Sequence, residues 1–402
     1  MALLRQLLAR REDRPVFVAV TLLALLTFAT YPAVDWYLRA IDVAPGFGFW
    51  DFGAYNGAVD RWVAGDSLYV ANDDGGYHGS YLYPPVGLLA FIPLLVLLPF
   101  RIAALAWVLG TALLCWVAMQ RLAGALGASF SPWERIALLP VVVGFHPLLL
   151  SMKLGQTAAA MGALLTFAAS ASLRGRDYLS GVLTACCGVV KLPYTPAGAH
   201  LLADRKRFLG AVGGGVALLA LSLLVFGVDA HRTFLDVLRW GIEEGGTARS
   251  PTVWLPPYYR PLYGVPFSFG LRVAASLAIV VGVVRAAPDA VRETTALGFA
   301  AVPLLAPLTY AYYFVAALPA VVLLVAAELS RPDGYPTLPV VGLFLLHVHS
   351  YGLREMGALA PDWYPELLLQ PGLVGNLLIV GLAGARVAAA GGPLVLHSFT
   401  AL

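Results

Sequence analysis

The feature that most constrains the fold is a succession of apolar segments along nearly the whole chain, each of about the length that crosses a bilayer. A membrane-spanning helix needs about 20 mostly apolar residues, fewer when half-helices pair. Candidate segments lie at 16–37, 102–122, 133–151, 156–173, 178–191, 208–227, 266–285, 309–329, 337–352 and 370–389. Only 12% of the 402 residues are charged and 59% are hydrophobic, whereas soluble domains carry about 25% charged residues. The sequence therefore predicts an all-α polytopic membrane protein.

Three further apolar stretches are ambiguous because they contain or follow prolines. They are residues 84–99, 194–203 and 293–307. Proline at membrane depth indicates broken helices, whose freed backbone groups face protein or a wet cavity. We interpret 84–99 as a re-entrant or surface segment and the other two stretches as crossings.

The distribution of basic residues favours this topology, because short cytoplasmic loops are enriched in Lys and Arg. With the N-terminal arginines inside, the other basic groups also fall inside. They are Arg121, residues 174–176, residues 205–207, Arg285, Arg292, Arg331 and Arg386. The chain is thus expected to form a single transmembrane domain, 1–402, of about twelve crossings, with both termini cytoplasmic, in the cell membrane. The net charge of +3 is small, and the basic residues lie mostly at segment ends. This distribution does not indicate nucleic-acid binding.

The predicted outer face carries the polar, aromatic and proline-rich parts of the chain. They include the loop 39–83, LGQ at 154–156, KLPYTP at 191–196, the loop 228–265 and APLTYAYY at 306–313. A single extracytoplasmic cavity would gather them. We interpret 39–83 as a catalytic loop and 228–265 as a substrate-binding loop.

Asp51 begins a predicted interfacial helix over residues 51–64, after a flexible Gly46–Gly48. Aromatic side chains around it suit the headgroup region, and Asp51 and Tyr55 lie one turn apart on the same face. Two interpretations remain open at this point. Asp51 is either a catalytic carboxylate or an N-cap that accepts hydrogen bonds from the first turn.

Isolated cations in apolar or aromatic surroundings are the next candidates. Lys191 follows the apolar run CCGVV, and an ionisable group there is a functional candidate, with snorkelling to the surface as the alternative. Arg260 lies in WLPPYYRPLYG, where a guanidinium can bind phosphate with fixed geometry. His146, before Pro147 at a helix end, either reaches the cavity or is a structural hydrogen-bond partner.

No metal or cofactor site is expected. His347 and His349 are two residues apart on a predicted helix and so face different directions, with no carboxylate within a turn to complete a ligand set. The chain also lacks the GxxxxGK[ST] and HExxH patterns.

The order and spacing of several short motifs resemble a known family. These are D-F-x-x-Y from Asp51, YPP, LGQ, RGR, KLP and APLTYAYY, over roughly residues 50–330. The pattern is similar to the GT-C superfamily, specifically the polyprenol-phosphate-mannose-dependent α-mannosyltransferases of glycosyltransferase family 87. The resemblance implies a GT-C-like helical bundle with an outward-facing cavity, a lipid-phosphate sugar donor and an aspartate base in the first outer loop. Asp51 matches that aspartate, and Lys191, Gln156 and Tyr83 match motif positions.

The chain departs from the family pattern near residue 310. Family members commonly carry a histidine there, whereas this chain has Tyr310, Tyr312 and Tyr313. A tyrosine can hydrogen-bond a phosphate or a sugar but does not titrate near neutral pH as histidine does. Tyr312 and Tyr313 are therefore substrate-binding candidates.

The chemistry of a polyprenyl-phosphate donor matches a single carboxylate. The leaving phosphate is already charged, so one base suffices to deprotonate the acceptor and inversion follows, whereas sugar–sugar hydrolysis calls for two carboxylates. We expect a hexosyltransferase that moves mannose to a lipid or glycan acceptor at the outer face of the bilayer. The alternatives are a secondary transporter or lipid flippase, which also uses broken helices, and an inactive GT-C relative.

Overall fold

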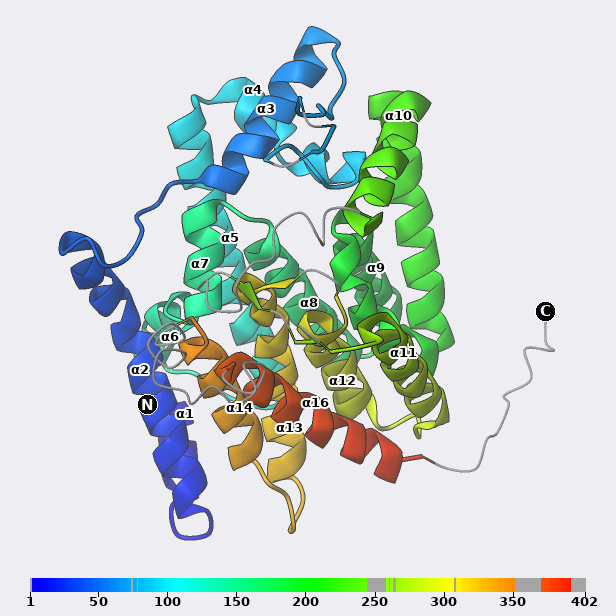
Figure 1. The fold of residues 1–402 in the computed structure, drawn as a ribbon. Helices are drawn as coiled ribbons and strands as arrows, with labels where there is room; N and C mark the ends of the chain where they lie inside the picture. Colours follow the sequence, from blue (N-terminus) through cyan, green and yellow to red (C-terminus); the bar gives the residue numbers. More distant parts are fainter. Residues whose placement is uncertain are drawn as a thin grey trace.

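The computed structural model is almost entirely helical (Figure 1). It describes residues 2–73, 75–77, 79–243, 258–259, 261–262, 265–306, 309–350 and 370–391. Within these ranges the strands are β1 (Tyr258–Tyr259) and β2 (Thr309–Tyr310), which pair antiparallel. The all-α class predicted from the sequence is confirmed for the described residues.

Every predicted apolar segment contains helix. In chain order the α-helices are α1 (Ala2–Leu8), α2 (Pro15–Ala40), α3 (Trp50–Ala64), α4 (Ile92–Leu97), α5 (Phe100–Ala125), α6 (Pro132–Val143), α7 (His146–Leu154), α8 (Ala158–Leu173), α9 (Asp177–Val190), α10 (Arg205–Glu243), α11 (Ser268–Arg285), α12 (Val291–Leu305), α13 (Ala317–Leu329), α14 (Thr337–Val348) and α16 (Pro371–Ala389). Three 3-10 helices join them: η1 (Pro85–Ala90), η2 (Leu192–Ala203) and η3 (Ala311–Ala316).

The described helices have the lengths and composition of a polytopic membrane protein. Six are long and apolar enough to cross a bilayer, and a seventh span arises if α6 and α7, bent by 69°, are taken as one. The six are α2, α5, the part of α10 over Arg205–Gly241, α11, the Ala311–Leu329 unit and α16. The helices α8, α9 and α14 are apolar but shorter. The larger number of crossings stays a prediction.

The stretch 84–99 forms two short elements, η1 and α4, rather than a long helix. Prolines at 84, 85, 93 and 99 interrupt it. Both elements pack beneath α3, where Phe52 and Tyr55 contact Phe91. This small apolar cluster supports α3 at one end of the molecule (Figure 1).

The centre of the core lies where α8 packs against η3 and α13. Small residues on α8 permit close packing: a Cβ placed on Gly162 would lie 2.1 Å from Val315 Cγ1. Small residues at such contacts let helices approach where lipid supplies no hydrophobic driving force. This contact holds η3, which directly follows β2, against the first part of α8.

The prediction of a loop over residues 228–265 is partly wrong, because residues 228–243 are helical and belong to α10. The helix breaks at Gly227, with φ 72° and ψ 175°, and the chain reverses there, bringing His231 Nε2 to 2.9 Å from Ser222 Oγ. Phe234 and Val237 lie one turn apart and are buried toward the α3 cluster. The charged side chains of this segment are exposed and pair along the helix, Arg232 with Asp229 and Arg239 with Asp236, so they occupy the outer face of an amphipathic helix.

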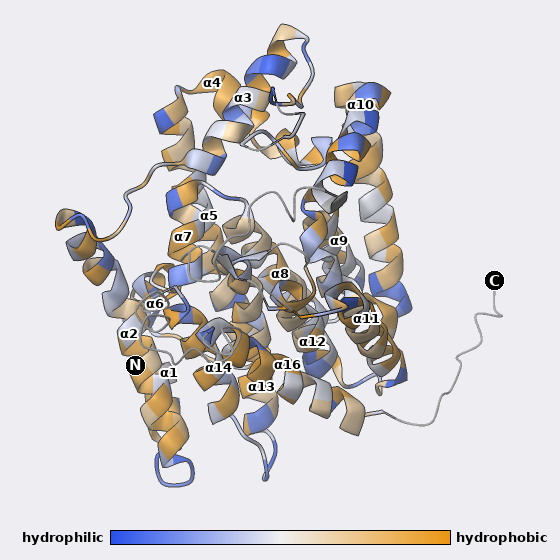
Figure 2. Ribbon diagram, viewed as in Figure 1, coloured by the Kyte–Doolittle hydropathy of each residue, from blue (hydrophilic) through white to orange (hydrophobic). Residues whose placement is uncertain are grey.

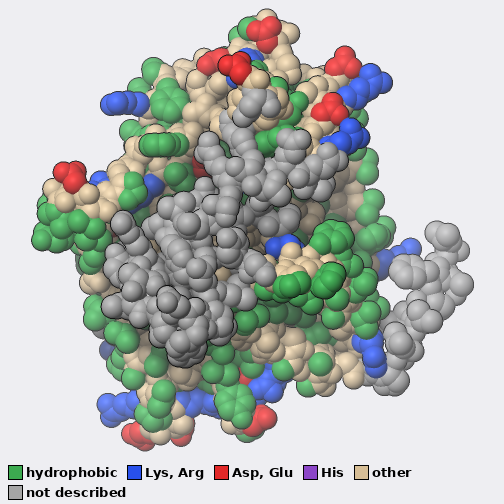
Figure 3. All heavy atoms as spheres, viewed as in Figure 1, with side chains coloured by type: hydrophobic (Ala, Val, Ile, Leu, Met, Phe, Trp, Pro, Cys, Tyr) green, Lys and Arg blue, Asp and Glu red, His purple; other side chains and the backbone are tan. Residues whose placement is uncertain are grey.

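Hydrophilic residues lie at the end of the molecule opposite α3 (Figure 2), and Lys and Arg side chains are among them (Figure 3). Arg14, before α2, donates to the carbonyl of Arg331 (2.9 Å). Arg331 pairs with Glu293 (2.9 Å), and Arg386 pairs with Glu328 (2.7 Å). This end thus unites basic groups that the sequence assigns to the cytoplasmic side, and the side itself stays a prediction.

Candidate active site

Gln156 is the centre of a polar cluster at the break between α7 and α8. Gly155 makes this break with φ 69°, and a Cβ there would lie 2.6 Å from Phe52 Cβ, so glycine is required on both counts. The Gln156 Oε1 atom accepts hydrogen bonds from Lys191 Nζ and Tyr55 Oη, both at 2.9 Å. The Nε2 atom faces three acceptors, listed by distance as Tyr83 Oη (2.9 Å), Asp51 Oδ2 (3.0 Å) and Tyr312 Oη (3.3 Å).

Asp51 reaches this cluster from the first turn of α3. The N-cap interpretation is wrong, because α3 begins at Trp50 and its N-cap, Phe49, is left-handed (φ 50°) without a side-chain cap. The Phe49 N–H instead donates to the Lys153 carbonyl (2.9 Å), which ties the start of α3 to α7. The carboxylate is therefore free of a capping role and is held by the Gln156 amide.

Burial sets the protonation of the groups in the cluster that lie outside the apolar helices. Desolvation raises the pKa of Asp51, and the Lys191 charge and the Gln156 hydrogen bond offset this only in part. Burial also raises the pKa of Tyr55 and of Tyr83. Both tyrosines thus remain neutral hydrogen-bond donors, and Asp51 is a stronger base than an exposed carboxylate.

Lys191 directly follows α9 and is fully buried, so the snorkelling interpretation is wrong. Its Nζ atom lies 4.9 Å from the ring centroids of Tyr83 and Tyr313 and 5.0 Å from that of Tyr312. Cations are attracted to aromatic faces at such distances. Three rings and the Gln156 carbonyl thus surround the ammonium group.

The tyrosine rings around Lys191 belong to a longer stack of nearly parallel rings. Tyr310 stacks on Tyr312 (5.1 Å, 6°), Tyr312 on Tyr313 (5.3 Å, 22°), and Tyr313 on Tyr194 (5.4 Å, 28°). The β1–β2 pairing holds the outer end, where the Thr309 hydroxyl donates to the Tyr259 carbonyl at 2.7 Å. The APLTYAYY motif thus contributes hydroxyl and ring surfaces where the family pattern led us to expect a histidine.

Two predicted site residues are not part of this cluster as described. Arg260 lies outside the described residues. His146 begins α7 in a separate aromatic group, where its backbone N–H donates to His347 Nδ1 (3.0 Å) and its ring lies 5.7 Å from that of Tyr31. The structure therefore brings together Asp51, Tyr83, Gln156, Lys191, Tyr312 and Tyr313.

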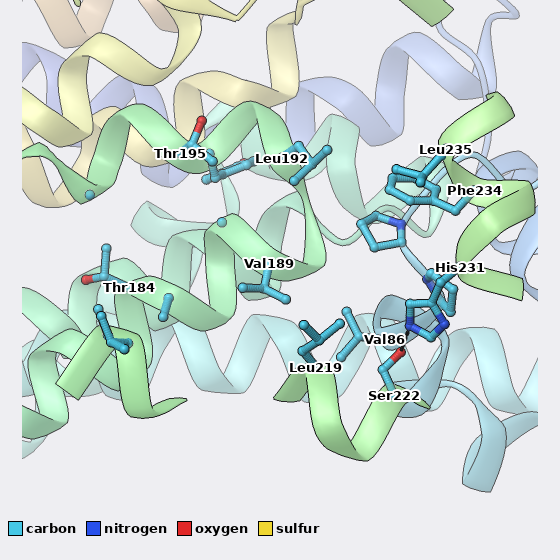
Figure 4. Close-up of a pocket in the computed structure, with 18 of the residues that line it drawn as sticks. Val86, Thr184, Val189, Leu192, Thr195, Leu219, Ser222, His231, Phe234 and Leu235 are labelled. Carbon is cyan, nitrogen blue, oxygen red and sulfur yellow. Dashed lines mark hydrogen bonds between the residues drawn. The ribbon is translucent and has the colours of Figure 1, made fainter. Parts of the chain in front are cut away.

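An apolar cavity of about 780 Å³ is lined by residues that include Val189, Leu219 and Leu235 (Figure 4). It runs between α9 with η2 on one side and the two parts of α10 on the other. Leu192 and Tyr194, which lie one and three residues after Lys191, line it, as does Pro84, which follows Tyr83. The buried Tyr194 hydroxyl has no hydrogen-bond partner among the described residues.

Sequence reasoning missed Asp35, which is buried on α2 and paired with Lys153 of α7 and, at 3.0 Å, with Arg39. The signal was present, because an acid within an apolar segment needs a partner. This pair anchors the end of α7, whose Lys153 carbonyl accepts from Phe49 two residues before Asp51.

Among the described residues, no group of three or more His, Cys, Asp or Glu side chains could hold a metal ion. The cluster itself contains one carboxylate, one buried ammonium and several tyrosine hydroxyls.

These observations define a helical, polytopic membrane protein with a single carboxylate in a lysine–tyrosine cluster beside an apolar cavity. A family model described as Glycosyltransferase family 87 matches residues 81–309, more than half of the chain, so the chain belongs to that family. The protein is thus a membrane glycosyltransferase. Comparison with curated proteins and with solved structures gave no match. The matched region contains Tyr83, Gln156 and Lys191, whereas Asp51 precedes it.

Proposed function

We propose that the protein transfers mannose from a polyprenyl-phosphate donor to a hydroxyl of a lipid or glycan acceptor, with inversion, and that Asp51 is the general base. One observation carries the proposal: the Gln156 amide binds the Asp51 carboxylate (3.0 Å) in a cluster that adjoins a large apolar cavity, which is lined by Pro84 and Leu192, the residues that follow Tyr83 and Lys191. A lipid-linked donor needs both features, a base near the sugar and an apolar site for the chain.

The cavity supports a polyprenyl tail as its occupant. Its lining is mainly aliphatic, and Val212, Leu219, Val228 and Leu235 along it are each about half exposed on the outer surface of the protein. In a bilayer these residues face lipid, so a tail can enter sideways without leaving the membrane. The donor phosphate would then lie at the Lys191 end, within reach of the unpartnered Tyr194 hydroxyl.

The proposed step requires one proton transfer. The acceptor oxygen attacks the anomeric carbon from the face opposite the phosphate, and the bond from that carbon to the phosphate oxygen breaks. Asp51 takes the hydroxyl proton, and the polyprenyl phosphate leaves with its electron pair. General-base assistance contributes about 10² to 10⁴ in rate. The Lys191 ammonium would stabilise the charge that develops on the leaving phosphate.

Gln156 has a positioning role in this proposal. Its carbonyl binds the Lys191 ammonium while its amide nitrogen binds Asp51, so a neutral group separates the two charges. A direct ion pair would lower the basicity of the carboxylate. The amide orients the base and leaves it able to accept a proton.

The orientation in the membrane is part of the proposal. The basic end, which contains Arg14, Arg331 and Arg386, would face the cytoplasm by the positive-inside rule, with both termini on that side. If η2, α12, the α6–α7 pair and the shorter helices α8, α9 and α14 also cross, the chain passes the membrane about twelve times. The Asp51 cluster then opens to the extracytoplasmic side of the cell membrane, and α3 lies in the interface.

Transport receives less support. A coupling-ion site near the bilayer midplane needs an acid that is free to bind and release its ion, but the buried acids within the apolar helices, Asp35, Glu293 and Glu328, are each paired with Lys or Arg. Membership of a glycosyltransferase family also favours transfer. The inactive-relative alternative is decided by assay.

The test is transfer by the purified protein in lipid, with radiolabelled polyprenyl-phosphate mannose and a membrane-lipid extract as acceptor. Asp51→Asn should reduce transfer at least about 100-fold. Asp60→Asn is the matched control, because Asp60 lies on the same helix, is exposed and bonds only Asn56 among the described residues (2.7 Å). The control should retain wild-type activity.

The outcomes separate the alternatives. An Asp51→Asn protein that transfers at the wild-type rate contradicts the base assignment. A wild-type protein that transfers from none of a panel of polyprenyl-phosphate sugars supports the inactive relative.

A further inference from the structure

A second pocket lies at the end of α5 farthest from α3, between α5, the connection 126–131 and the start of α6. Its volume is about 540 Å³. Trp116, Gln120, Arg121 and Arg135 are among the residues that line it. The Trp116 indole donates to the Arg135 carbonyl (2.6 Å), which joins the two helices across the pocket.

The pocket is cationic and lacks internal compensation. Neither the Arg121 nor the Arg135 guanidinium forms an ion pair or hydrogen bond with another described residue. A third guanidinium, that of Arg174, donates to the Arg121 carbonyl (3.1 Å). The neighbouring Glu134 carboxylate is engaged by the backbone N–H groups of Ser131 (2.7 Å) and Leu4 (3.0 Å). An anion is therefore the ligand that this pocket favours.

The depth of the pocket matches the boundary of the hydrocarbon layer. Arg101 and Arg121 are the only charged residues of α5. Twenty residues of helix separate them, which is about 30 Å and equals the hydrocarbon thickness. Trp116 and the exposed Trp133 lie at the same end, as expected for aromatic residues at a membrane interface.

An apolar surface continues from the pocket toward the membrane centre. On α5, Leu113 and Leu109 lie one and two turns from Trp116 on the same face, and both are more than half exposed. On α6, Leu139 lies one turn beyond Arg135 and is 39% exposed. A ligand with an anionic head and apolar chains would satisfy both the arginines and this surface.

We propose that this pocket binds the headgroup of an anionic phospholipid, with the phosphate between Arg121 and Arg135 and the acyl chains along Leu109, Leu113 and Leu139. Basic pockets at helix ends recognise anionic lipid headgroups in this way. The site is remote from Asp51, and the proposal is independent of the sugar-transfer reaction.

The test is native mass spectrometry of delipidated protein titrated with phosphatidylglycerol or phosphatidylcholine. The wild type should bind phosphatidylglycerol in preference, and Arg121→Gln with Arg135→Gln should weaken that binding about tenfold or more. Arg10→Gln with Arg11→Gln is the control for bulk charge, because both residues are exposed at the N-terminal end. The control should bind like the wild type.

Further arms keep the proposal falsifiable. Ser129→Trp, in the exposed connection, should fill the pocket and weaken phosphatidylglycerol binding while both arginines remain. Inorganic phosphate at millimolar concentration should not compete; competition would identify a site for the free anion and overturn the lipid assignment. Equal loss in the control variant, or unchanged binding in both pocket variants, would also overturn it.

Discussion

The two ends of the molecule treat carboxylates in different ways. At the basic end, Glu328 is fully buried and accepts two hydrogen bonds from Arg386, both at 2.7 Å. At the other end, the Asp51 carboxylate and the Lys191 ammonium are joined only through the Gln156 amide. The first arrangement fixes charge, whereas the second keeps an acid and a cation close without neutralising them.

This difference separates a structural role from a chemical one. A bidentate Arg–carboxylate pair is directional and holds its helices in register, here α13 against α16. A carboxylate that must take a proton in each catalytic cycle cannot be committed to such a pair. The comparison therefore predicts opposite responses to substitution at the two ends.

The largest effect on activity beyond Asp51 itself is expected at Lys191. Lys191→Met keeps the length of the side chain but removes the charge that stabilises the leaving phosphate, so kcat should fall about 100-fold or more. Lys206→Met, exposed at the basic end, is the control and should retain activity. Transfer kinetics in nanodiscs measure both, and a kcat within twofold of wild type for Lys191→Met would refute the role.

At the basic end the expected effect is on stability. Glu328→Gln leaves the Arg386 guanidinium without its carboxylate, and removing one partner of a buried pair costs about 3–5 kcal/mol. Thermal unfolding in detergent should show a clearly lower melting temperature, with kcat per folded molecule close to wild type. A large loss of kcat without loss of stability would break the division between the two ends.

The smallest effect is expected at the outer edge of the cluster. The hydrogen bond between Gln156 and Tyr312 is long, at 3.3 Å, whereas that to Tyr83 is 2.9 Å. One hydrogen bond contributes about 1 kcal/mol, so Tyr312→Phe should lower kcat/KM by no more than about fivefold. Tyr83→Phe should cost more, and the reverse order would show that distance to Gln156 does not rank these contacts.

Much of the fold could be predicted from the sequence because apolar length and proline position act locally. The helix at 51–64, the interruption of 84–99 and the break near Gly155 are all signalled by neighbouring residues. The turn at Gly227 could not be predicted from neighbouring residues. The helix after it is held by the packing of Phe234 against Tyr69, which lies far away in sequence.

The candidate site was predictable residue by residue but not as an arrangement. The LGQ, KLP and APLTYAYY motifs each contribute a member, yet no local pattern indicates that the Gln156 amide separates Asp51 from Lys191. That relation depends on how α3 packs against the α7–α8 break. Asp35 is signalled by its place in an apolar segment, but its pairing with Lys153 depends on the packing of two different helices.

The pH dependence of transfer tests most directly whether the Asp51 carboxylate is the base. Burial raises the pKa of Asp51, and the base must be ionised to act, so kcat/KM in the wild type should fall as pH drops through a value above that of an ordinary carboxyl group. Lys191 faces Asp51 across Gln156, and Tyr55 and Tyr83 contribute neutral hydroxyls.

The decisive measurement is therefore the acidic limb of kcat/KM in the wild type and in Gln156→Glu. The variant places a second carboxyl group about 3 Å from Asp51, and two carboxylates sharing a site raise one another's pKa. The limb should move to higher pH by about one unit or more. A limb that does not move would mean that the titrating base is not Asp51 beside Gln156.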